Sequence, residues 1–455
     1  MKRRLAEFAR ASRGTLRGAD ADFAGVGIDT RKLAPGDLFI ALAGEHSDGH
    51  DWLDAAAAAG AAGAVVQRPG KVALAQIVVG DAQQALAAAG ACWREDFTGP
   101  LVGVAGSNGK TTVKEMTAAI LSQSGACLST RGNLNNHLGV PLTLLRLDPE
   151  HRSAVIEMGA NRPGDVAALA ALARPTISIV TNAGAEHLEG FGSLDAVARA
   201  EGEMVAALAP SGTAVIPADD AYTPLWRSMT PARVQTFGLA ATADWRATAI
   251  EATVDARGFI SRFTLQTPAG EVAVELALAG RHNVVNALAA AAAAGAAGAS
   301  LTQIAAGLAC MRAVAGRLQF RLTAQGAWLI DDSYNANPSS VQAGLDVLSA
   351  LPGRRWLVLG DMAELGEFAA DAHREAGRLA RAQGVERLYA FGPLAALAAE
   401  SFGAGAERYT DAAALSRTLG QALQPDVRLL VKGSRLNRLE RVVNALLPAT
   451  MPANG

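Results

Sequence analysis

The chain has 455 residues, of which 50% are hydrophobic and 18% are charged. Its 41 Lys and Arg residues nearly balance its 43 Asp and Glu residues, giving a formal net charge of −2. This composition excludes a disordered chain, and the near-neutral charge argues against nucleic acid or an anionic membrane surface as the main partner. At about 150 residues per domain, the length predicts roughly three domains.

Cysteine usage and hydropathy restrict the class of protein further. Cys92, Cys127 and Cys310 lie far apart and form no CxxC pair, which argues against a disulfide framework and against a cysteine zinc site. The basic N-terminus is not followed by an apolar segment. The longest run rich in alanine and glycine, 287–299, is shorter than a ~20-residue membrane span. We therefore expect a cytoplasmic protein without membrane insertion, and a monomer.

Short apolar, β-branched runs alternate with alanine-rich stretches, a pattern typical of parallel α/β architecture. The expected central strands are Leu101–Ala105, Ala154–Glu157, Ile177–Thr181, Ala214–Pro217, Trp328–Asp331, Trp356–Gly360 and Leu429–Lys432. Residues 239–280 alternate as antiparallel strands do, which predicts an excursion within the middle domain. Composition changes at 96–100 and 314–317, so we place three domains at 1–98, 99–314 and 315–455.

A glycine-rich turn follows the first expected strand, and Lys110-Thr111-Thr112 then opens a helix. The spacing Gly106-x-x-Gly109-Lys110-Thr111 lets backbone N–H groups surround a phosphate at a helix N-terminus. The Lys110 ammonium can reach β- and γ-phosphates, and the Thr111 hydroxyl suits Mg²⁺. This stretch predicts a nucleoside triphosphate site, although an ordinary turn with a solvated lysine remains the alternative.

Two later strand ends carry candidate metal ligands. Glu157 ends a strand of the same sheet, where its carboxylate would hold Mg²⁺ or, alternatively, cap a neighbouring helix. His187 follows the strand Ile177–Thr181 in a glycine-punctuated loop. Its neutral imidazole is a candidate ligand for a second divalent ion, with a packed or solvated histidine as the alternative.

An alanine-rich helix begins at Arg281-His282-Asn283. Asn283 and Asn286 are three residues apart and therefore share one helix face, from which they would bind a base or a ribose. The alternative is a polar first turn that caps its own helix.

The last domain has a dense polar turn, Asp331–Pro338, between a strand and a helix. Arg317 before this turn and Lys432, Ser434 and Arg435 after a later strand add polar and cationic groups. Cations from a second domain would neutralise a transferring phosphoryl group. Alternatively, the turn is only a helix cap and the cations are solvated.

Taken together, these stretches resemble the Mur ligases, the ATP-dependent amide-forming enzymes of peptidoglycan precursor synthesis. The pieces occur in family order along the whole chain: 106–112, 132–136 with 139–143, 157–159, 187–192, 280–286, 316–319, 331–338, 360–366 and 432–435. The last-domain pieces resemble the member that adds a dipeptide more than those that add one amino acid. In the first domain, 28–31, 35–39 and 49–51 resemble the family's uridine-diphosphate substrate module.

The resemblance implies an α/β protein with a small N-terminal substrate domain, a central P-loop ATPase domain with a parallel sheet, and a Rossmann-like C-terminal domain. It implies that ATP phosphorylates the carboxylate of UDP-N-acetylmuramoyl-tripeptide, and that the amine of D-alanyl-D-alanine then displaces phosphate. ADP, phosphate and UDP-MurNAc-pentapeptide would be the products. The implied setting is cell wall biogenesis, and with it cell shape and division.

The resemblance also distributes roles over matching positions. Catalytic roles fall on Lys110, His187 and Arg317. ATP would be bound by Gly106, Ser107, Asn108, Gly109, Lys110, Thr111, Thr112, His282, Asn283, Asn286, Arg317 and Asp332. The substrates would be bound by Thr30, Arg31, Asn133, Asn135, Asn136, Tyr334, Asn335, Asn337, Lys432, Ser434 and Arg435, and Mg²⁺ by Thr111, Glu157, His187 and Glu201.

The chain departs from its relatives in the helix after the His187 loop. Many relatives carry a carbamylated lysine there, and this chain has Glu201. A glutamate supplies a carboxylate without CO₂ on a shorter arm, so we expect Glu201 to take the place of the modified lysine near Mg²⁺.

Three alternatives stay open: a ligase that adds glutamate to a folate or another amino-acid-adding Mur enzyme, a P-loop motor or switch, and a non-catalytic nucleotide-binding module. The sequence leaves undecided whether the third residue of the acceptor peptide is diaminopimelate or lysine. It also leaves undecided which base deprotonates the incoming amine.

Overall fold

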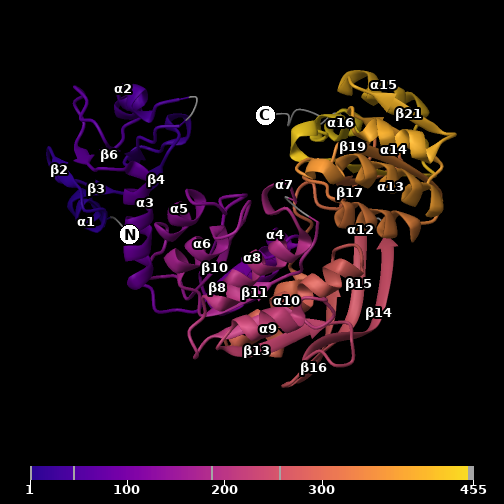
Figure 1. Ribbon diagram of the computed structural model, residues 1–455, viewed down its shortest axis with the longest axis horizontal. Coiled ribbons are helices and arrows are strands. Elements are labelled where there is room, and N and C mark those ends of the chain that lie inside the picture. The colour runs from indigo at the N-terminus through magenta and orange to yellow at the C-terminus, as the bar shows by residue number, and fades with distance from the viewer. Residues whose placement is uncertain (1–2, 45–46, 186–187, 256–257, 449–455) are drawn as a thin grey trace, which may run out of the picture.

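The computed structural model of the chain describes residues 3–44, 47–185, 188–255 and 258–448. Three mixed sheets, each flanked by helices, follow one another along the chain as an N-terminal, a central and a C-terminal body (Figure 1). The predicted three-part α/β architecture is therefore confirmed. No helix within the described residues is long and apolar enough to cross a membrane.

The N-terminal sheet has five short strands in the order β2-β7-β6-β5-β4. Its elements are α1 (Leu5–Ala11), β2 (Thr15–Arg17), β4 (Val26–Gly27), β5 (Leu38–Ile40), α2 (Leu53–Ala58), β6 (Gly63–Val66), β7 (Gln76–Val78) and α3 (Ala82–Glu95), with a small ladder of β1 (Arg3–Arg4) and β3 (Asp22–Phe23). The helix α3 reaches down to the central body (Figure 1). There the Arg94 guanidinium donates to the carbonyls of Ala173 and Arg174, at 2.6 and 2.9 Å. This helix ties the N-terminal body to the central one.

The central sheet has nine strands in the order β16-β15-β14-β13-β12-β11-β8-β10-β9, parallel except at the β14-β15-β16 edge. Its strands are β8 (Leu101–Ala105), β9 (Cys127–Ser129), β10 (Ser153–Glu157), β11 (Ile177–Val180), β12 (Thr213–Pro217), β13 (Arg233–Gly238), β14 (Trp245–Asp255), β15 (Gly258–Thr267) and β16 (Gly270–Leu276). Its helices are α4 (Lys110–Leu121), α5 (Gly139–Leu144), α6 (Asp165–Ala173), α7 (Leu188–Phe191), α8 (Leu194–Ala206), α9 (Thr223–Met229), α10 (Arg281–Ala296) and α11 (Leu301–Ala309). The predicted antiparallel excursion at 239–280 is confirmed.

The sequence of the central strands explains their position. The strands β8, β10 and β11 are buried along their whole length, because helices cover both faces of the parallel sheet. On one face lies α10, whose run of small alanines is fully buried against α4 and the sheet. The helix α4 therefore starts at the carboxyl end of β8 with its axis fixed by packing on two sides.

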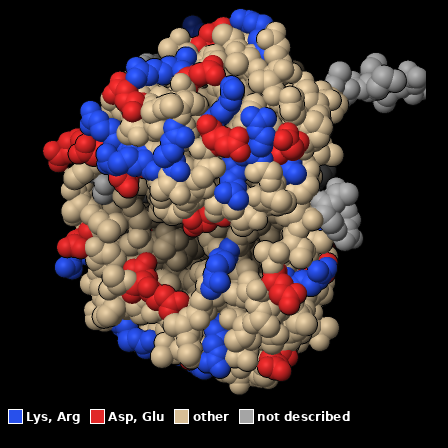
Figure 2. Space-filling view, turned by 90° about the vertical axis from the view of Figure 1, so that its right-hand side faces the viewer, with Lys and Arg blue, Asp and Glu red and all other residues tan. Residues whose placement is uncertain are grey.

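The C-terminal sheet has the order β17-β18-β22-β19-β20-β21, parallel except for the β17 edge. Its elements are β17 (Gln319–Leu322), β18 (Trp328–Asp332), α12 (Pro338–Ser349), β19 (Arg354–Gly360), α13 (Ala369–Ala382), β20 (Arg387–Phe391), α14 (Ala395–Phe402), β21 (Ala406–Tyr409), α15 (Ala412–Ala422), β22 (Val427–Lys432) and α16 (Glu440–Leu446). This body sits above the long strands β14 and β15 (Figure 1). Acidic and basic side chains alternate on the face drawn in Figure 2, with a hollow between its upper and lower parts.

Helix α11 packs so closely on α4 that it requires a glycine. A Cβ at Gly307 would lie 2.4 Å from the Cα of Ile120, a backbone atom that cannot move aside. We expect Gly307→Ala to destabilise the protein by about 1–3 kcal/mol through overpacking, measured as a lower midpoint of urea unfolding. The matched control is Gly420→Ala in α15, where a Cβ meets only the Gln325 amide at 3.9 Å. There the higher helix propensity of alanine is expected to raise the midpoint, by up to about 1 kcal/mol. Equal shifts in both variants would contradict this account.

Candidate active site

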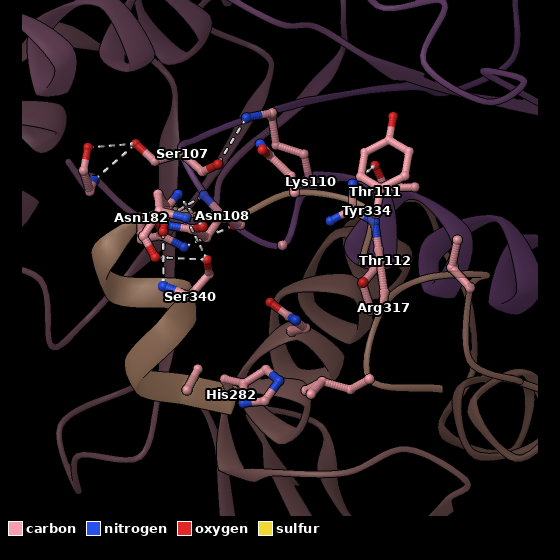
Figure 3. A pocket seen from close by; sticks show the side chains of 18 of the residues that line it. Ser107, Asn108, Lys110, Thr111, Thr112, Asn182, His282, Arg317, Tyr334 and Ser340 are labelled. Carbon is pink, nitrogen blue, oxygen red and sulfur yellow. Dashed lines mark hydrogen bonds between the residues drawn. The ribbon is translucent and has the colours of Figure 1, made fainter. Parts of the chain in front are cut away.

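A cavity of about 540 Å³ lies where the carboxyl ends of β8, β10 and β11 meet the C-terminal body (Figure 3). It brings together most of the residues that the sequence singled out. Those that line it are Ser107, Asn108, Gly109, Lys110, Thr111, Thr112, Asn133, Asn135, Asn136, Glu157, His282, Asn283, Asn286, Arg317, Asp332, Tyr334, Asn335, Asn337 and Lys432. These residues come from four segments of the central body and three of the C-terminal body, which thus share one cavity.

The glycine-rich turn follows β8 directly, and two of its glycines have a steric reason. Gly106 has φ +121°, and a Cβ there would lie 2.1 Å from the Thr181 hydroxyl. Gly109 has φ +83°, and a Cβ there would lie 2.5 Å from the Asn286 amide oxygen. The Lys110 ammonium turns back over the loop and donates to the carbonyls of Gly106 and Ser107, at 2.5 and 3.0 Å. The loop is thus closed around its own lysine at the N-terminus of α4, the geometry expected of a phosphate site.

Glu157 ends β10, the neighbour of β8 in the sheet. Its carboxylate is 2% exposed, and Oε1 accepts a hydrogen bond from the Asn135 amide at 2.9 Å. The ammonium of Lys114, which is completely buried in α4, lies 3.9 Å from Oε2. Oε2 has no hydrogen-bond partner in the part of the chain that the structure describes. A buried carboxylate oxygen that has an ion-pair contact but no hydrogen bond, at the wall of a cavity, is suited to a cation.

The first turn of α10 forms another wall of the cavity. Asn286 donates to the Asn283 side chain at 3.1 Å, and Asn283 donates to the Ala279 carbonyl at 2.7 Å. The two amides therefore lie on one face of the helix. The capping alternative does not hold at the N-cap itself, because Gly280 has no side chain to cap the helix. Burial lowers the pKa of His282, and the cation of Lys432 lowers it further while the Asp332 carboxylate opposes the shift. Burial therefore favours the neutral imidazole.

The C-terminal body reaches the glycine-rich turn, residues 106–112, through Arg317. We call this turn the phosphate loop. The Arg317 guanidinium donates to the Thr111 hydroxyl at 3.2 Å and lies over the Tyr334 ring, 4.5 Å from the centroid. Figure 3 shows Arg317 and Tyr334 beside Thr111. The ring face attracts the cation and limits its rotamers, so it helps to hold the guanidinium on the loop.

An ion pair closes the base of the polar turn Asp331–Pro338. The Lys432 ammonium lies 2.5 Å from Asp332 Oδ2 and donates to the Asn335 carbonyl at 3.0 Å. Asp332 Oδ1 accepts from the Leu318 amide at 3.1 Å. The helix-cap alternative holds for one residue of this turn, because the Asn337 side chain accepts from the Ser340 amide at 2.8 Å and caps α12.

Several predicted residues do not line the cavity. Thr30 and Arg31 lie in a 3₁₀ turn of the N-terminal body, where Arg31 pairs with Asp29 and lowers the pKa of that carboxyl to about 2. Ser434 accepts from the Asn437 amide at 2.8 Å, and the Arg435 guanidinium lies 5.8 Å from the Tyr334 ring centroid. Gly106 lies behind the loop residues that face the cavity. The substrate roles of Thr30, Arg31, Ser434 and Arg435 stay predictions.

One of the four predicted Mg²⁺ ligands, Glu201, is not among the residues that line the cavity. Glu201 is 5% exposed on α8, and its Oε2 accepts from the Gly106 amide at 2.6 Å. This places its carboxylate against the backbone of the phosphate loop, outside the set of cavity-lining residues, and its role as a ligand stays a prediction. His187 lies outside the described residues.

The structure also adds residues that the sequence interpretation did not assign. The Asn182 side chain accepts from the Asn108 amide at 3.0 Å and donates to the Asn108 carbonyl at 2.9 Å. The Ser339 hydroxyl donates to Asn337 Oδ1 at 3.1 Å and accepts from the side-chain nitrogen of Asn108, not its backbone N–H, at 3.0 Å. The sequence could have indicated Asn182 as a site residue, because it directly follows a strand of the parallel sheet. Nothing in the sequence around Ser339 indicates a role in the site.

Comparison with known proteins identifies three family models along the chain. The Mur ligase family catalytic domain matches residues 22–94, the Mur ligase middle domain matches 104–294, and the Mur ligase glutamate ligase domain matches 316–435. Together these matches span well over half of the chain.

Relatives and solved structures agree with these matches. UDP-N-acetylmuramoyl-tripeptide–D-alanyl-D-alanine ligase of Escherichia coli is 46% identical over 95% of this chain and 96% of its own length. The Bacillus subtilis enzyme of the same name is 31% identical over 99% of this chain and 100% of its own. The crystal structure of MurF from Acinetobacter baumannii superposes with a TM-score of 0.90 at 35% identity, covering 98% of this chain and 99% of that one. MurF from Thermotoga maritima in complex with ADP gives 0.81 at 26% identity, covering 93% and 96%.

The ion pair under the polar turn can be tested by breaking one side of it. We expect Lys432→Met to destabilise the protein by about 3–5 kcal/mol, because the Asp332 carboxylate is then buried without its cation. The double variant Asp332→Asn with Lys432→Met leaves no buried charge and is expected to recover part of that loss. The midpoint of urea unfolding measures both, and a double variant less stable than Lys432→Met would contradict the explanation.

Proposed function

The chain belongs to the Mur ligase family, and we propose that it joins D-alanyl-D-alanine to UDP-N-acetylmuramoyl-tripeptide, with conversion of ATP to ADP and phosphate. The observation that carries this proposal is full-length similarity, 46% identical over 95% of the chain, to a ligase of that name. A cavity that joins the phosphate loop to the C-terminal body supports it independently. The product, UDP-MurNAc-pentapeptide, is a precursor of peptidoglycan.

The reaction has to make a carboxylate into an electrophile. Transfer of the γ-phosphoryl group of ATP to the tripeptide carboxylate forms an acyl phosphate, in which phosphate replaces oxide as the leaving group. The amine of D-alanyl-D-alanine attacks the acyl carbon, loses a proton, and expels phosphate to leave an amide. Each step before the attack brings anions together, so cations near the phosphates stabilise the transition state.

The residues of the cavity can supply these cations from two bodies. Lys110 would contact the β- and γ-phosphates after its ammonium leaves the carbonyls of Gly106 and Ser107, to which it now donates. Arg317 approaches from the opposite side, already in contact with Thr111. Asn283 and Asn286 have amide groups at the cavity wall for the base or ribose of ATP. The reactive centre then lies between the bodies, where their contact excludes the water that would hydrolyse an acyl phosphate.

Mg²⁺ fits the donors at the cavity wall. Thr111 offers a hydroxyl and Glu157 a buried carboxylate oxygen without a hydrogen bond among the described residues, both in the cavity lining. Within the described residues there is no cluster of three or more His, Cys, Asp or Glu side chains that could hold a metal. Mg²⁺ needs no such cluster, since it is commonly bound by one or two carboxylates together with substrate phosphates and water. When bound, the ion would neutralise charge on the β- and γ-phosphates.

The acceptor nucleotide would extend toward the N-terminal body. Thr30 and Arg31 belong to that body, whereas Asn133, Asn135 and Asn136 line the cavity shortly before α5, which packs on α3 of the N-terminal body. We assign the uridine-diphosphate moiety to the first pair and the peptide end to the asparagines. The enzyme would act in the cytoplasm, as a monomer, in cell wall biogenesis that maintains cell shape and permits division.

The ligase reaction is tested directly with the purified protein, ATP, Mg²⁺ and UDP-MurNAc-tripeptide, with and without D-alanyl-D-alanine. We expect sustained phosphate release only with both substrates present, and the pentapeptide product in the mass spectrum. Equal phosphate release without either substrate would show an ATPase and overturn the assignment. Parallel assays with single amino acids in place of the dipeptide distinguish an amino-acid-adding member of the family.

The role of Glu157 is tested by the isosteric change Glu157→Gln. Removing the charge next to Lys114 weakens the affinity for a divalent cation, so we expect the Mg²⁺ concentration for half-maximal rate to rise at least about tenfold, a loss of roughly 1.4 kcal/mol in binding. Glu115→Gln is the matched control, because Glu115 also pairs with Lys114, at 2.9 Å, but its side chain is 39% exposed. An unchanged Mg²⁺ dependence in Glu157→Gln, or the same shift in both variants, would exclude the proposed role.

A further inference from the structure

Three side chains form a closed ring of hydrogen bonds between the phosphate loop and helix α12. The Asn108 amide nitrogen donates to the Ser339 hydroxyl at 3.0 Å, and that hydroxyl donates to Asn337 Oδ1 at 3.1 Å. The Asn337 amide nitrogen then donates back to Asn108 Oδ1 at 2.9 Å. We call Asn108, Asn337 and Ser339 the interdomain ring, because the first belongs to the central body and the other two to the C-terminal body.

The direction of every bond in the ring is fixed by chemistry. Asn337 Oδ1 also accepts from the Ser340 amide at 2.8 Å, so its amide nitrogen has to point toward Asn108. Asn108 must consequently present its oxygen to Asn337 and its nitrogen to Ser339. The hydroxyl of Ser339 is then left to donate to Asn337. Each side chain donates once and accepts from a ring neighbour, a pattern in which the bonds strengthen one another.

The ring is built on fixed backbone at both ends. The Asn108 carbonyl accepts from the Thr181 hydroxyl at 2.7 Å, and its amide is held by Asn182 at the end of β11. On the other side, Pro338 and the Asn337 cap fix the first turn of α12. The next loop of the central body approaches so closely that a Cβ at Gly184 would lie 3.0 Å from the Asn108 amide nitrogen and 3.4 Å from Ser339. Figure 3 shows Asn108 and Asn182 beside the first turn of α12 at Ser340.

We propose that the interdomain ring couples the ATP site to the dipeptide site. Asn108 is a positioning residue in this scheme. Its backbone belongs to the loop that holds the phosphates, and its side chain fixes the start of α12 and the polar turn before it, 331–337. This inference rests on the proposed function, in which the C-terminal body brings the dipeptide to the acyl phosphate.

The coupling follows from the geometry of the ring. All three bonds exist together only when the two bodies are docked, because no member can reach across if α12 moves away. A nucleotide that orders the phosphate loop therefore favours the docked arrangement, and a dipeptide that binds the docked arrangement favours nucleotide binding equally, since such linkage is reciprocal. Loss of the ring should thus weaken the binding of each ligand in the presence of the other, whereas nucleotide binding in the absence of dipeptide keeps its contacts with the loop backbone.

The test is a double-mutant cycle on the ligase reaction with Asn108→Ala, Ser339→Ala and the pair. Each single variant is expected to raise KM for D-alanyl-D-alanine and lower kcat, together about fivefold or more in kcat/KM, a typical size of coupling between two sites. The dissociation constant of AMPPNP, measured without dipeptide, should rise by a smaller factor than KM for the dipeptide. The pair should be no worse than the poorer single variant, and Ser339→Thr, which keeps the hydroxyl, should restore most of the activity. Losses that multiply in the pair, or a loss confined to AMPPNP binding, would overturn the proposal.

Ser340→Ala is the matched control on the same turn of α12. The Ser340 hydroxyl bonds only to the Asn337 backbone among the described residues, so this change weakens the helix cap without removing a ring member. Its effect on kcat/KM should multiply with that of Asn108→Ala. If Ser340→Ala and Ser339→Ala combine with Asn108→Ala in the same way, the ring has no special role.

A measurement without substrates separates this proposal from the assigned reaction. Small-angle X-ray scattering of the unliganded protein should give a larger radius of gyration for the Asn108→Ala, Ser339→Ala pair than for the unmodified chain, while Ser340→Ala should not change it. Identical curves for all three would overturn the ring as a docking contact. If the unmodified chain made no pentapeptide but the curves differed as expected, the assigned reaction would fail and the ring would stand as an interdomain contact.

Discussion

The structure depends on a short loop whose polar groups are held from several sides at once. The phosphate loop contacts Glu201 from α8, Asn182 from the end of β11 and Arg317 from the C-terminal body. The backbone N–H groups of Gly106 and Asn108 are not paired in the regular ladder of a strand or helix, and they donate instead to the side chains of Glu201 and Asn182. The partners of the loop come from the central and the C-terminal body, so both bodies have to assemble before the site exists.

The burial of the central sheet follows from this requirement. The loop starts at the end of β8, and a shift of this strand would displace all the partners of the loop. The strand is fixed by packing, because it lies between β10 and β11 with helices on both faces of the sheet. The alanine-rich α10 lets a helix approach the sheet closely enough for Asn286 to contact Gly109. Small residues in that helix thus serve the site, and bulkier ones would move the asparagines away from the loop.

The sequence predicted the parts of the site that depend on local chain pattern. The strand ends and the glycine spacing placed Lys110, Thr111 and Glu157 correctly at one edge of the sheet, because carboxyl ends of parallel strands meet there. Contacts between bodies could not be predicted in this way. The pairing of Asn108 with Ser339 joins residues 231 positions apart, and nothing in either segment indicates the other. The same limit explains why Lys114 received no role, although its completely buried ammonium lies beside Glu157.

Glu201 shows how one substitution can be accommodated by such a loop. Its carboxylate accepts the Gly106 N–H at 2.6 Å, and the Lys110 ammonium contacts the carbonyl of the same glycine at 2.5 Å. The backbone of Gly106 is therefore held by a carboxylate at its N–H group and by an ammonium group at its carbonyl. A negative charge behind the loop opposes the binding of phosphate in front of it, unless cations outweigh it. Lys110, Arg317 and a divalent ion at Glu157 would do so, and the backbone of Gly106 would meanwhile stay fixed. In this chain the carboxylate thus has a structural task that does not require it to touch a metal.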